Sequence, residues 1–201
     1  MYSANLTDFL LNTNIGTRMH SEIADATSKF QDSLPVSSDH LMKLLGKLDI
    51  PYQRFDHVAL RTVEDSKKVQ SQFNSDSGGG GHIKNLYLRD NKKRNILFVA
   101  EQDRKIDLKD LPTLLGTGRL SFGSAERLFE TLGVRPGAVT PLAMINGVNA
   151  GVSLFLDNDL KKFRSLYVHP LVNDRTLEID LVDLEKLFQH IGVELNWVNL
   201  T

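Results

Sequence analysis

Short helical and extended patterns alternate irregularly along this chain, with no internal repeat. Alternating apolar positions predict strands, and apolar positions three or four residues apart predict helices. Strands are predicted over residues 52–58, 82–88, 95–100, 152–156, 165–168, 176–179 and 193–198. Helices are predicted over residues 40–48, 107–115, 124–132 and 181–191, and a short polar helix begins near Thr62. This order predicts a single α/β (α+β) domain with a mixed sheet rather than a regular βαβ array.

Two further segments are predicted outside this main pattern, an N-terminal appendage and a loop. Residues 1–34 are predicted to form a helical appendage to a main domain at residues 35–201, with a helix over residues 17–29. The apolar positions at helical spacing are Met19, Ile23, Ala26 and Phe30. Residues 137–146 are predicted to form a loop that runs into an extended segment.

The composition excludes several kinds of chemistry. The chain has 201 residues and no cysteine, so a thiol nucleophile, a cysteine-bound zinc and a disulfide are all excluded. Its six histidines show no metal-binding spacing, and we predict neither a metal nor another cofactor. No apolar run approaches the ~20 residues of a membrane span, and the N-terminus lacks a signal pattern. We therefore predict a cytoplasmic protein without membrane contact.

Positive charge is concentrated in one part of a nearly neutral chain. The formal net charge is -1, but residues 84–109 contain eight basic and four acidic residues. This local excess of +4 would suit contact with a phosphate backbone. The same count also fits a solvated hairpin surface, so charge alone does not decide.

Three familiar nucleotide-binding and hydrolase motifs are incomplete in this sequence. The glycines at 78–81 are not followed by Gly-Lys-Ser/Thr, because Lys84 stands between Ile83 and Asn85. Gly116 could begin a dinucleotide fingerprint, but Ser121 occupies the position of the third glycine. The segment 118–123 is one residue too long for a nucleophile elbow. Known motifs therefore leave the chemistry open.

Four stretches taken together are more specific. They are KNLYLRD at residues 84–90, GRLSFGSAERL at 118–128, LGVRPGAVTP at 132–141 and HPLVN at 169–173. In this order and spacing the chain resembles the YbaK/prolyl-tRNA-synthetase-associated editing domain family. Within that family it is most similar to the free-standing alanyl-tRNA(Pro) deacylases of the PrdX or ProX type. The resemblance covers about residues 38–192, most of the chain.

The resemblance implies a fold and an activity. The fold would be a mixed, partly barrel-like sheet surrounded by helices. The activity would be hydrolysis of the ester that joins a wrong amino acid to tRNA, most often alanine on tRNA(Pro), without a metal or a covalent nucleophile. The implied partners are mischarged tRNA and prolyl-tRNA synthetase. Alternatives are a deacylase for cysteinyl-tRNA(Pro) or another aminoacyl-tRNA, and a non-catalytic module that binds tRNA or a synthetase.

The resemblance also implies which residues act on the ester. The predicted catalytic residues are Lys84, Gly137, Thr140 and His169. Lys84 would hold the terminal phosphate or orient the ester carbonyl, since its ammonium is a compact charge with three donors. Backbone amides near Gly137 could bind the ester oxygen as charge develops on it. His169 would contact the substrate amino group or position water.

Further residues are predicted to bind the substrate. Those for the aminoacyl group are Asn85, Phe122, Pro141, Val168 and Asn173, and those for the tRNA backbone are Arg89, Lys92, Lys93 and Arg94. The sequence departs from the family at residues 57–65, where HVALRTVED replaces a frame with proline and an aromatic residue after the histidine. Because this segment is expected to border the pocket mouth, the change bears on the choice of amino acid more than on the reaction.

Overall fold

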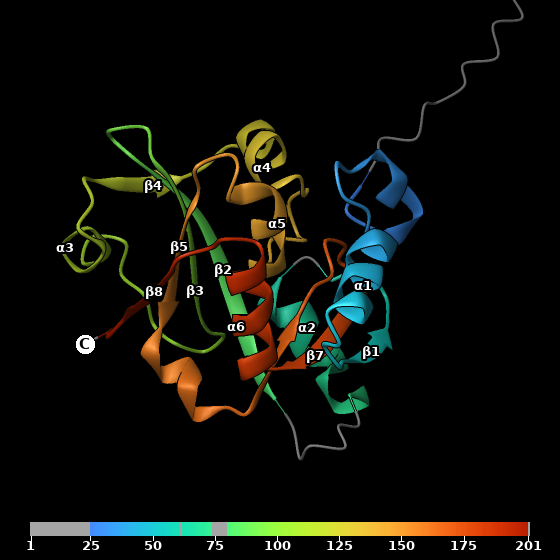
Figure 1. Ribbon diagram of the computed structural model, residues 1–201. Helices are drawn as coiled ribbons and strands as arrows, with labels where there is room; N and C mark the ends of the chain where they lie inside the picture. Colours follow the sequence, from blue (N-terminus) through green and yellow to red (C-terminus); the bar gives the residue numbers. More distant parts are fainter. Residues whose placement is uncertain (1–24, 61, 74–79, 201) are drawn as a thin grey trace, which may run out of the picture.

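One mixed sheet forms the centre of the protein in the computed structural model, which describes residues 25–60, 62–73 and 80–200 (Figure 1). The strand order is β1-β7-β6-β2-β3-β5-β8, and β4 pairs with β2 outside this path. The strands are β1 (Gln53–Asp56), β2 (Gly81–Asp90), β3 (Asn95–Glu101), β4 (Leu120–Phe122), β5 (Ser153–Asp157), β6 (Ser165–Val168), β7 (Arg175–Asp180) and β8 (Leu195–Val198). The pairs β2–β6, β3–β5 and β5–β8 are parallel and the others antiparallel. The predicted fold class is confirmed.

The long strand β2 changes neighbours along its length. One of its edges pairs with β3 from Ile83 to Arg89. The opposite edge pairs with β6 at Gly81 and His82, and with β4 from Leu88 onward. Between these two contacts, no strand of the described residues pairs with residues 83–86 on this edge. The sheet therefore has a short open edge in its interior.

Serine or threonine side chains cap several of the helices at their N-termini. The longer ones are α1 (Ser38–Lys47), α4 (Ala125–Leu132) and α6 (Leu181–His190), and the shorter ones are α2 (Val63–Val69), α3 (Leu111–Leu115) and α5 (Met144–Gly147). Four 3-10 helices are η1 (Ser28–Ser33), η2 (Gln70–Gln72), η3 (Pro141–Ala143) and η4 (Asn158–Lys162). Ser124 caps α4 by accepting from the Arg127 N–H, and Gly133 ends it at φ 66°.

The sheet has a hydrophobic core on each face. Successive strand residues point to opposite faces, so Leu97 and Val99 of β3 enter one core while Phe98 enters the other. The larger core is covered by α1, α4, α5 and α6, and the smaller one by α3 and β4. The central strands β2 and β3 are thereby fixed from both sides, which gives the open edge a rigid support.

Residues 25–34 of the predicted appendage lie against the domain. Ala26 and Leu34 are buried in the larger core. The Ser28 N–H and hydroxyl both donate to the Asp174 carboxylate, with a shortest distance of 2.7 Å. Of the predicted helix at 17–29, residues 17–24 lie outside the described residues, and residues 25–27 are not helical.

Two local predictions differ from the structure, and one strand was not predicted. The extended segment predicted within residues 137–146 is wrong, because Thr140 caps a 3-10 helix that begins at Pro141 and continues into α5. Proline suits the first turn of a helix, where its missing N–H is not needed. The predicted helix at 107–115 is shortened to α3, and strand β4 was not predicted.

Candidate active site

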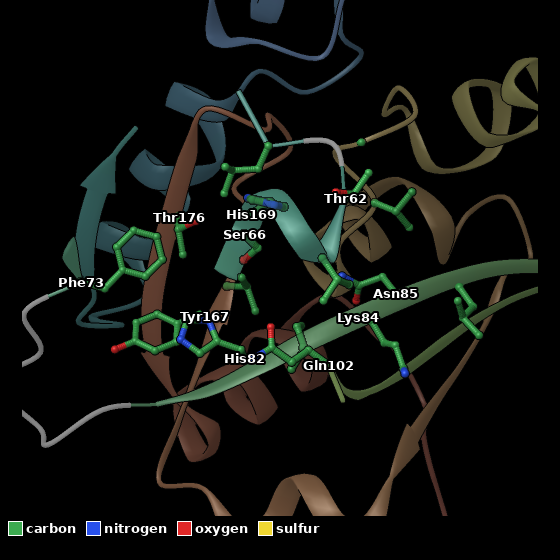
Figure 2. A pocket seen from close by; sticks show the side chains of 17 residues that line it. Thr62, Ser66, Phe73, His82, Lys84, Asn85, Gln102, Tyr167, His169 and Thr176 are labelled. Atoms are coloured by element: carbon green, nitrogen blue, oxygen red, sulfur yellow. The ribbon is translucent and has the colours of Figure 1, made fainter. Parts of the chain in front are cut away.

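A pocket of about 340 Å³ lies where the open edge of β2 faces α2, β6 and the loop around Gly137 (Figure 2). The predicted residues that line it are Lys84, Asn85, Gly137, Val168 and His169. They come from three separate parts of the sequence. The fold therefore brings together five of the predicted site residues in one cavity.

The backbone of β2 contributes hydrogen-bonding groups to this pocket. The His82 carbonyl accepts from the Gln102 N–H at 2.9 Å. The backbone N–H and C=O groups of the even-numbered residues of β2 therefore face β3. In an antiparallel pair the alternate residues point their backbone groups to the other edge. The Asn85 N–H and C=O therefore face the open edge. This open stretch ends at Tyr87, whose carbonyl accepts from the Gly123 N–H at 3.0 Å. No strand of the described residues pairs with the two Asn85 groups, so the pocket wall presents one backbone donor and one backbone acceptor.

Lys84 and Asn85 point to opposite sides of β2. The Lys84 ammonium extends away from His169 and donates to the backbone carbonyl of Arg104 (Figure 2). Burial lowers the pKa of Lys84, while nearby Glu101 and Asp103 raise it. The Asn85 Oδ1 atom is buried and has no hydrogen-bond partner among the described residues. A buried unpaired amide oxygen is costly unless a ligand or water satisfies it, so Asn85 is suited to accept from a bound molecule.

His169 is held as a neutral acceptor. Its Nδ1 atom lies 2.9 Å from the Arg175 carbonyl, which can only accept, so Nδ1 carries the proton. Burial lowers the pKa of His169, the hydrogen bond to Arg175 raises it, and nearby His57 lowers it further. Nε2 is then left with its lone pair, and no partner for it is found in the described part of the chain. Such an atom can accept from an ammonium group.

The second histidine near the pocket has a different environment. His57 Nδ1 lies 2.7 Å from the Val58 carbonyl and Nε2 lies 2.9 Å from Thr176 Oγ1. The same donor argument assigns the proton to Nδ1, so Nε2 accepts from the threonine hydroxyl. The two imidazole centroids are 6.2 Å apart. His57 therefore lies beside the pocket with both ring nitrogens engaged.

The loop before η3 contributes Gly137 but not its neighbours. Gly137 has a φ of 92°, a conformation that favours glycine, and it lines the pocket. Thr140 is fully buried, and its Oγ1 accepts from the Leu142 N–H at 3.3 Å. Pro141 is also buried. Neither residue lines the pocket, so both fix the loop that presents Gly137.

Two further predicted residues lie outside the cavity. Asn173 is buried; its N–H donates to Ala26 and its carbonyl accepts from Leu60, which fixes the segment before α2. Phe122 on β4 is 64% exposed and does not line the pocket. Phe122 pairs with Leu88 in the C-terminal part of β2, away from His169.

The four predicted tRNA-binding residues cluster at the turn between β2 and β3. Arg94 pairs with Asp90 at 2.7 Å, and Lys93 has a φ of 68° in the turn. Lys92 is exposed, and the Arg89 Nε atom is buried without a partner among the described residues. Six residues of strand separate Lys84 from Asp90, about 20 Å at ~3.4 Å per residue. The basic turn and the pocket therefore lie at opposite ends of one strand.

The residues that the sequence did not single out are mainly aromatic and hydroxyl groups of the pocket wall. They include Ser66, Phe73, His82, Gln102, Tyr167 and Thr176. His82 stacks on Tyr167 with ring centroids 4.4 Å apart. Their common location depends on the β2–β6 and β6–β7 pairings, for which the sequence carries no signal.

Protonation of His82 should couple folding to pH. Burial lowers the pKa of His82 from 6.5 to about 4, so the unfolded chain binds more protons between these values. The contribution of His82 to the free energy of unfolding is full above pH 6.5 and is lost as the pH falls toward 4. Because the ring is partly exposed, we expect this loss to be on the order of 1–2 kcal/mol. Urea unfolding at pH 7 and 4.5 should show a smaller loss for His82→Gln than for the wild type; equal losses would contradict the assignment.

Two classes of site receive no support from the described residues. In that part of the chain, no group of three or more His, Cys, Asp or Glu side chains could hold a metal ion. No described helix is long and apolar enough to cross a membrane.

The fold and the pocket define a small mixed α/β domain with a cavity, lined by both polar and apolar side chains, at an open strand edge. Residues 59–187 match the model of the aminoacyl-tRNA editing domain. The chain is 37% identical to the prolyl-tRNA editing protein ProX of Acetoanaerobium sticklandii, over 74% of this chain and 88% of that protein. The chain belongs to the aminoacyl-tRNA editing domain family.

More distant proteins extend this comparison. The prolyl-tRNA synthetase associated domain-containing protein 1 of Danio rerio is 30% identical, over 88% of this chain and 98% of that protein. A crystal structure of a provisionally assigned trans-editing enzyme for prolyl tRNA synthetase aligns with a TM-score of 0.55 and 18% identity. It covers 80% of this chain and 97% of that one, and at this identity the likeness concerns the fold.

Proposed function

We propose that this protein hydrolyses the ester of a mischarged aminoacyl-tRNA, with alanine on tRNA(Pro) as the substrate and with cytoplasmic tRNA and prolyl-tRNA synthetase as its partners. The observation that carries the proposal is the pocket at the open edge of β2. Among the described residues, it combines a neutral histidine acceptor, an asparagine oxygen without a hydrogen-bond partner and backbone groups of β2 that no strand pairs. Family membership and the similarity to ProX support the same reaction.

Three protein groups are assigned roles in orienting the ester. His169 Nε2 accepts from the ammonium of the amino acid, and the Asn85 N–H donates to the ester oxygen as negative charge develops on it. Lys84 exchanges its bond with the Arg104 carbonyl for the phosphate of the terminal nucleotide. The free ribose hydroxyl next to the ester activates water, so the protein need not supply a base. Orientation of this kind can lower a barrier by several kcal/mol.

A covalent mechanism through Thr176 is the rival to water attack. The distance of 2.9 Å between Thr176 Oγ1 and His57 Nε2 is that of a nucleophile and its base. However, His57 is oriented by the neutral Val58 carbonyl, which stabilises an imidazolium less than a carboxylate does. We expect Thr176→Val to retain deacylation within about tenfold, whereas loss of a nucleophile costs far more. Single-turnover rates decide, and a loss of three or more orders of magnitude would favour the covalent route.

A panel of mischarged tRNAs tests the function. The protein is incubated with alanyl-, cysteinyl- and prolyl-tRNA(Pro) and with alanyl-tRNA(Ala), and ester loss is followed. We expect the ester to be lost fastest from alanyl-tRNA(Pro). A hydrophobic pocket separates residues that differ by one small group by only ~1–3 kcal/mol, so cysteinyl-tRNA(Pro) is the closest competitor. Binding of tRNA without release of any amino acid would identify a non-catalytic binding module instead.

The basic turn between β2 and β3 should affect binding and not chemistry. Neutralising Lys92 and Lys93 to glutamine should weaken tRNA binding and reduce the log-log salt dependence by up to about 0.9 per lost phosphate contact. At saturating tRNA the rate should be unchanged, because this turn lies about 20 Å from Lys84 along β2. Affinity measured from 50 to 200 mM salt tests this. An unchanged salt slope would show that the turn does not contact the backbone.

A further inference from the structure

Three aromatic rings form one end of the pocket, and we call Phe73, His82 and Tyr167 the aromatic wall (Figure 2). His82 and Tyr167 stack with centroids 4.4 Å apart and planes 22° apart. The ring centroid of Phe73 lies 5.5 Å from that of Tyr167 and 6.1 Å from that of His82. Phe55 supports Phe73 from β1 at 4.8 Å. The three rings come from the end of η2, from β2 and from β6.

The aromatic wall is not part of either hydrophobic core. None of its three residues belongs to the two clusters of buried side chains, whereas their neighbours Leu166 and Val168 do. Phe73 and His82 remain partly exposed and face the cavity. His82 is uncharged at neutral pH because burial lowers its pKa to about 4. The wall therefore offers neutral flat surfaces to a ligand.

The position of the wall fits a particular part of the substrate. His82 precedes Lys84 by two residues on the same face of β2, a separation of about 7 Å. If the polar end of the pocket holds the ester and the terminal phosphate, the group next to them is the terminal nucleoside. A single-stranded 3′ end leaves its last base free to stack, and aromatic side chains are the usual partners of such bases.

We propose that the aromatic wall stacks on the terminal nucleobase of the tRNA. This inference rests on the proposed function, because it takes the ester to lie between His169 and the Asn85 N–H, with the terminal phosphate at Lys84. The wall thereby places the ribose and fixes the ester against the open edge of β2. If the aromatic wall instead bound an aromatic side chain of the esterified amino acid, uncharged tRNA would carry no group to occupy it.

Binding of uncharged tRNA tests the wall separately from the reaction. The dissociation constants are measured for one tRNA with a complete CCA end and for the same tRNA without its terminal adenosine. The wild type should bind the complete tRNA about 5- to 150-fold more tightly, which corresponds to ~1–3 kcal/mol for one stacked base. Phe73→Leu should abolish most of this preference, because leucine keeps the apolar volume and loses the ring. Phe73→Tyr should retain it.

The outcomes separate the two proposals. Equal affinity of the wild type for both tRNAs, absence of measurable binding, or a full preference in Phe73→Leu would overturn the stacking site. Release of alanine by a protein without the preference would leave the proposed function intact. A preference for the complete tRNA without release of any amino acid would do the reverse. Melting temperatures of both variants identify any loss caused by unfolding.

Discussion

Replacing Lys84 with alanine is expected to reduce the single-turnover rate of deacylation by about 100-fold or more. The reason is that an anchor on the terminal phosphate positions the ester, and a displacement of ~1 Å at the reacting atoms can cost 10²-fold. Stability should change much less, by about 0.5–1.5 kcal/mol, because the side chain makes one hydrogen bond to the Arg104 carbonyl. Single-turnover kinetics and urea unfolding measure the two effects.

A matched lysine elsewhere provides the control. Lys186 on α6 pairs with Asp183 at 2.6 Å and takes no part in the pocket. Lys186→Ala therefore removes a comparable charge and one polar contact, and it should leave the rate unchanged. If Lys84→Ala keeps the wild-type single-turnover rate, Lys84 has no role in the chemical step.

Removal of residues 1–34 is expected to destabilise the domain by on the order of 3–5 kcal/mol relative to a chain that begins at residue 25. Burial of a leucine side chain contributes about 1.5–3 kcal/mol, and Leu34 is buried together with Ala26. The hydrogen bonds from Ser28 to the Asp174 carboxylate contribute further, since bonds to charged groups are worth about 1.5–3 kcal/mol. Asp174 would then lose these donors.

Urea unfolding of the 25–201 and 35–201 chains gives the difference directly. The same pair of chains tests the boundary predicted at residue 34. Equal stability would mean that residues 25–34 are a separable appendage, despite their contacts with the core.

Local structure was predictable where a segment carries its own signals. Residues 124–132 combine a serine cap, helical spacing and a terminal glycine, and α4 lies at residues 125–132. By contrast, β4 has three residues and exists through its pairing with β2. The helix at Met144–Gly147 is preceded by Pro141, which also fits a turn, so sequence signals do not separate the two. Short elements depend on tertiary contacts that periodicity does not contain.

The candidate site divides in the same way. Lys84, Gly137 and His169 lie in strings that resemble a family, and the fold brings all three to one pocket. The aromatic residues Phe73 and Tyr167 lie in sequence segments for which no such resemblance was found. Their meeting with His82 requires the parallel pairing of β2 with β6, which places residues 82 and 167 side by side. Sheet order is a long-range property, and a single sequence gives little information on it.

The open stretch of β2 has a consequence for aggregation. Unpaired strand edges are templates for strands of other chains, and proteins protect them by keeping them short or covered. Residues 83–86 are bounded by β6 on one side and β4 on the other, so an incoming strand would find too few backbone groups to pair with. The outer strands β1 and β8 have only four residues each. The sheet can therefore expose peptide groups to a small ligand while resisting intermolecular strand addition.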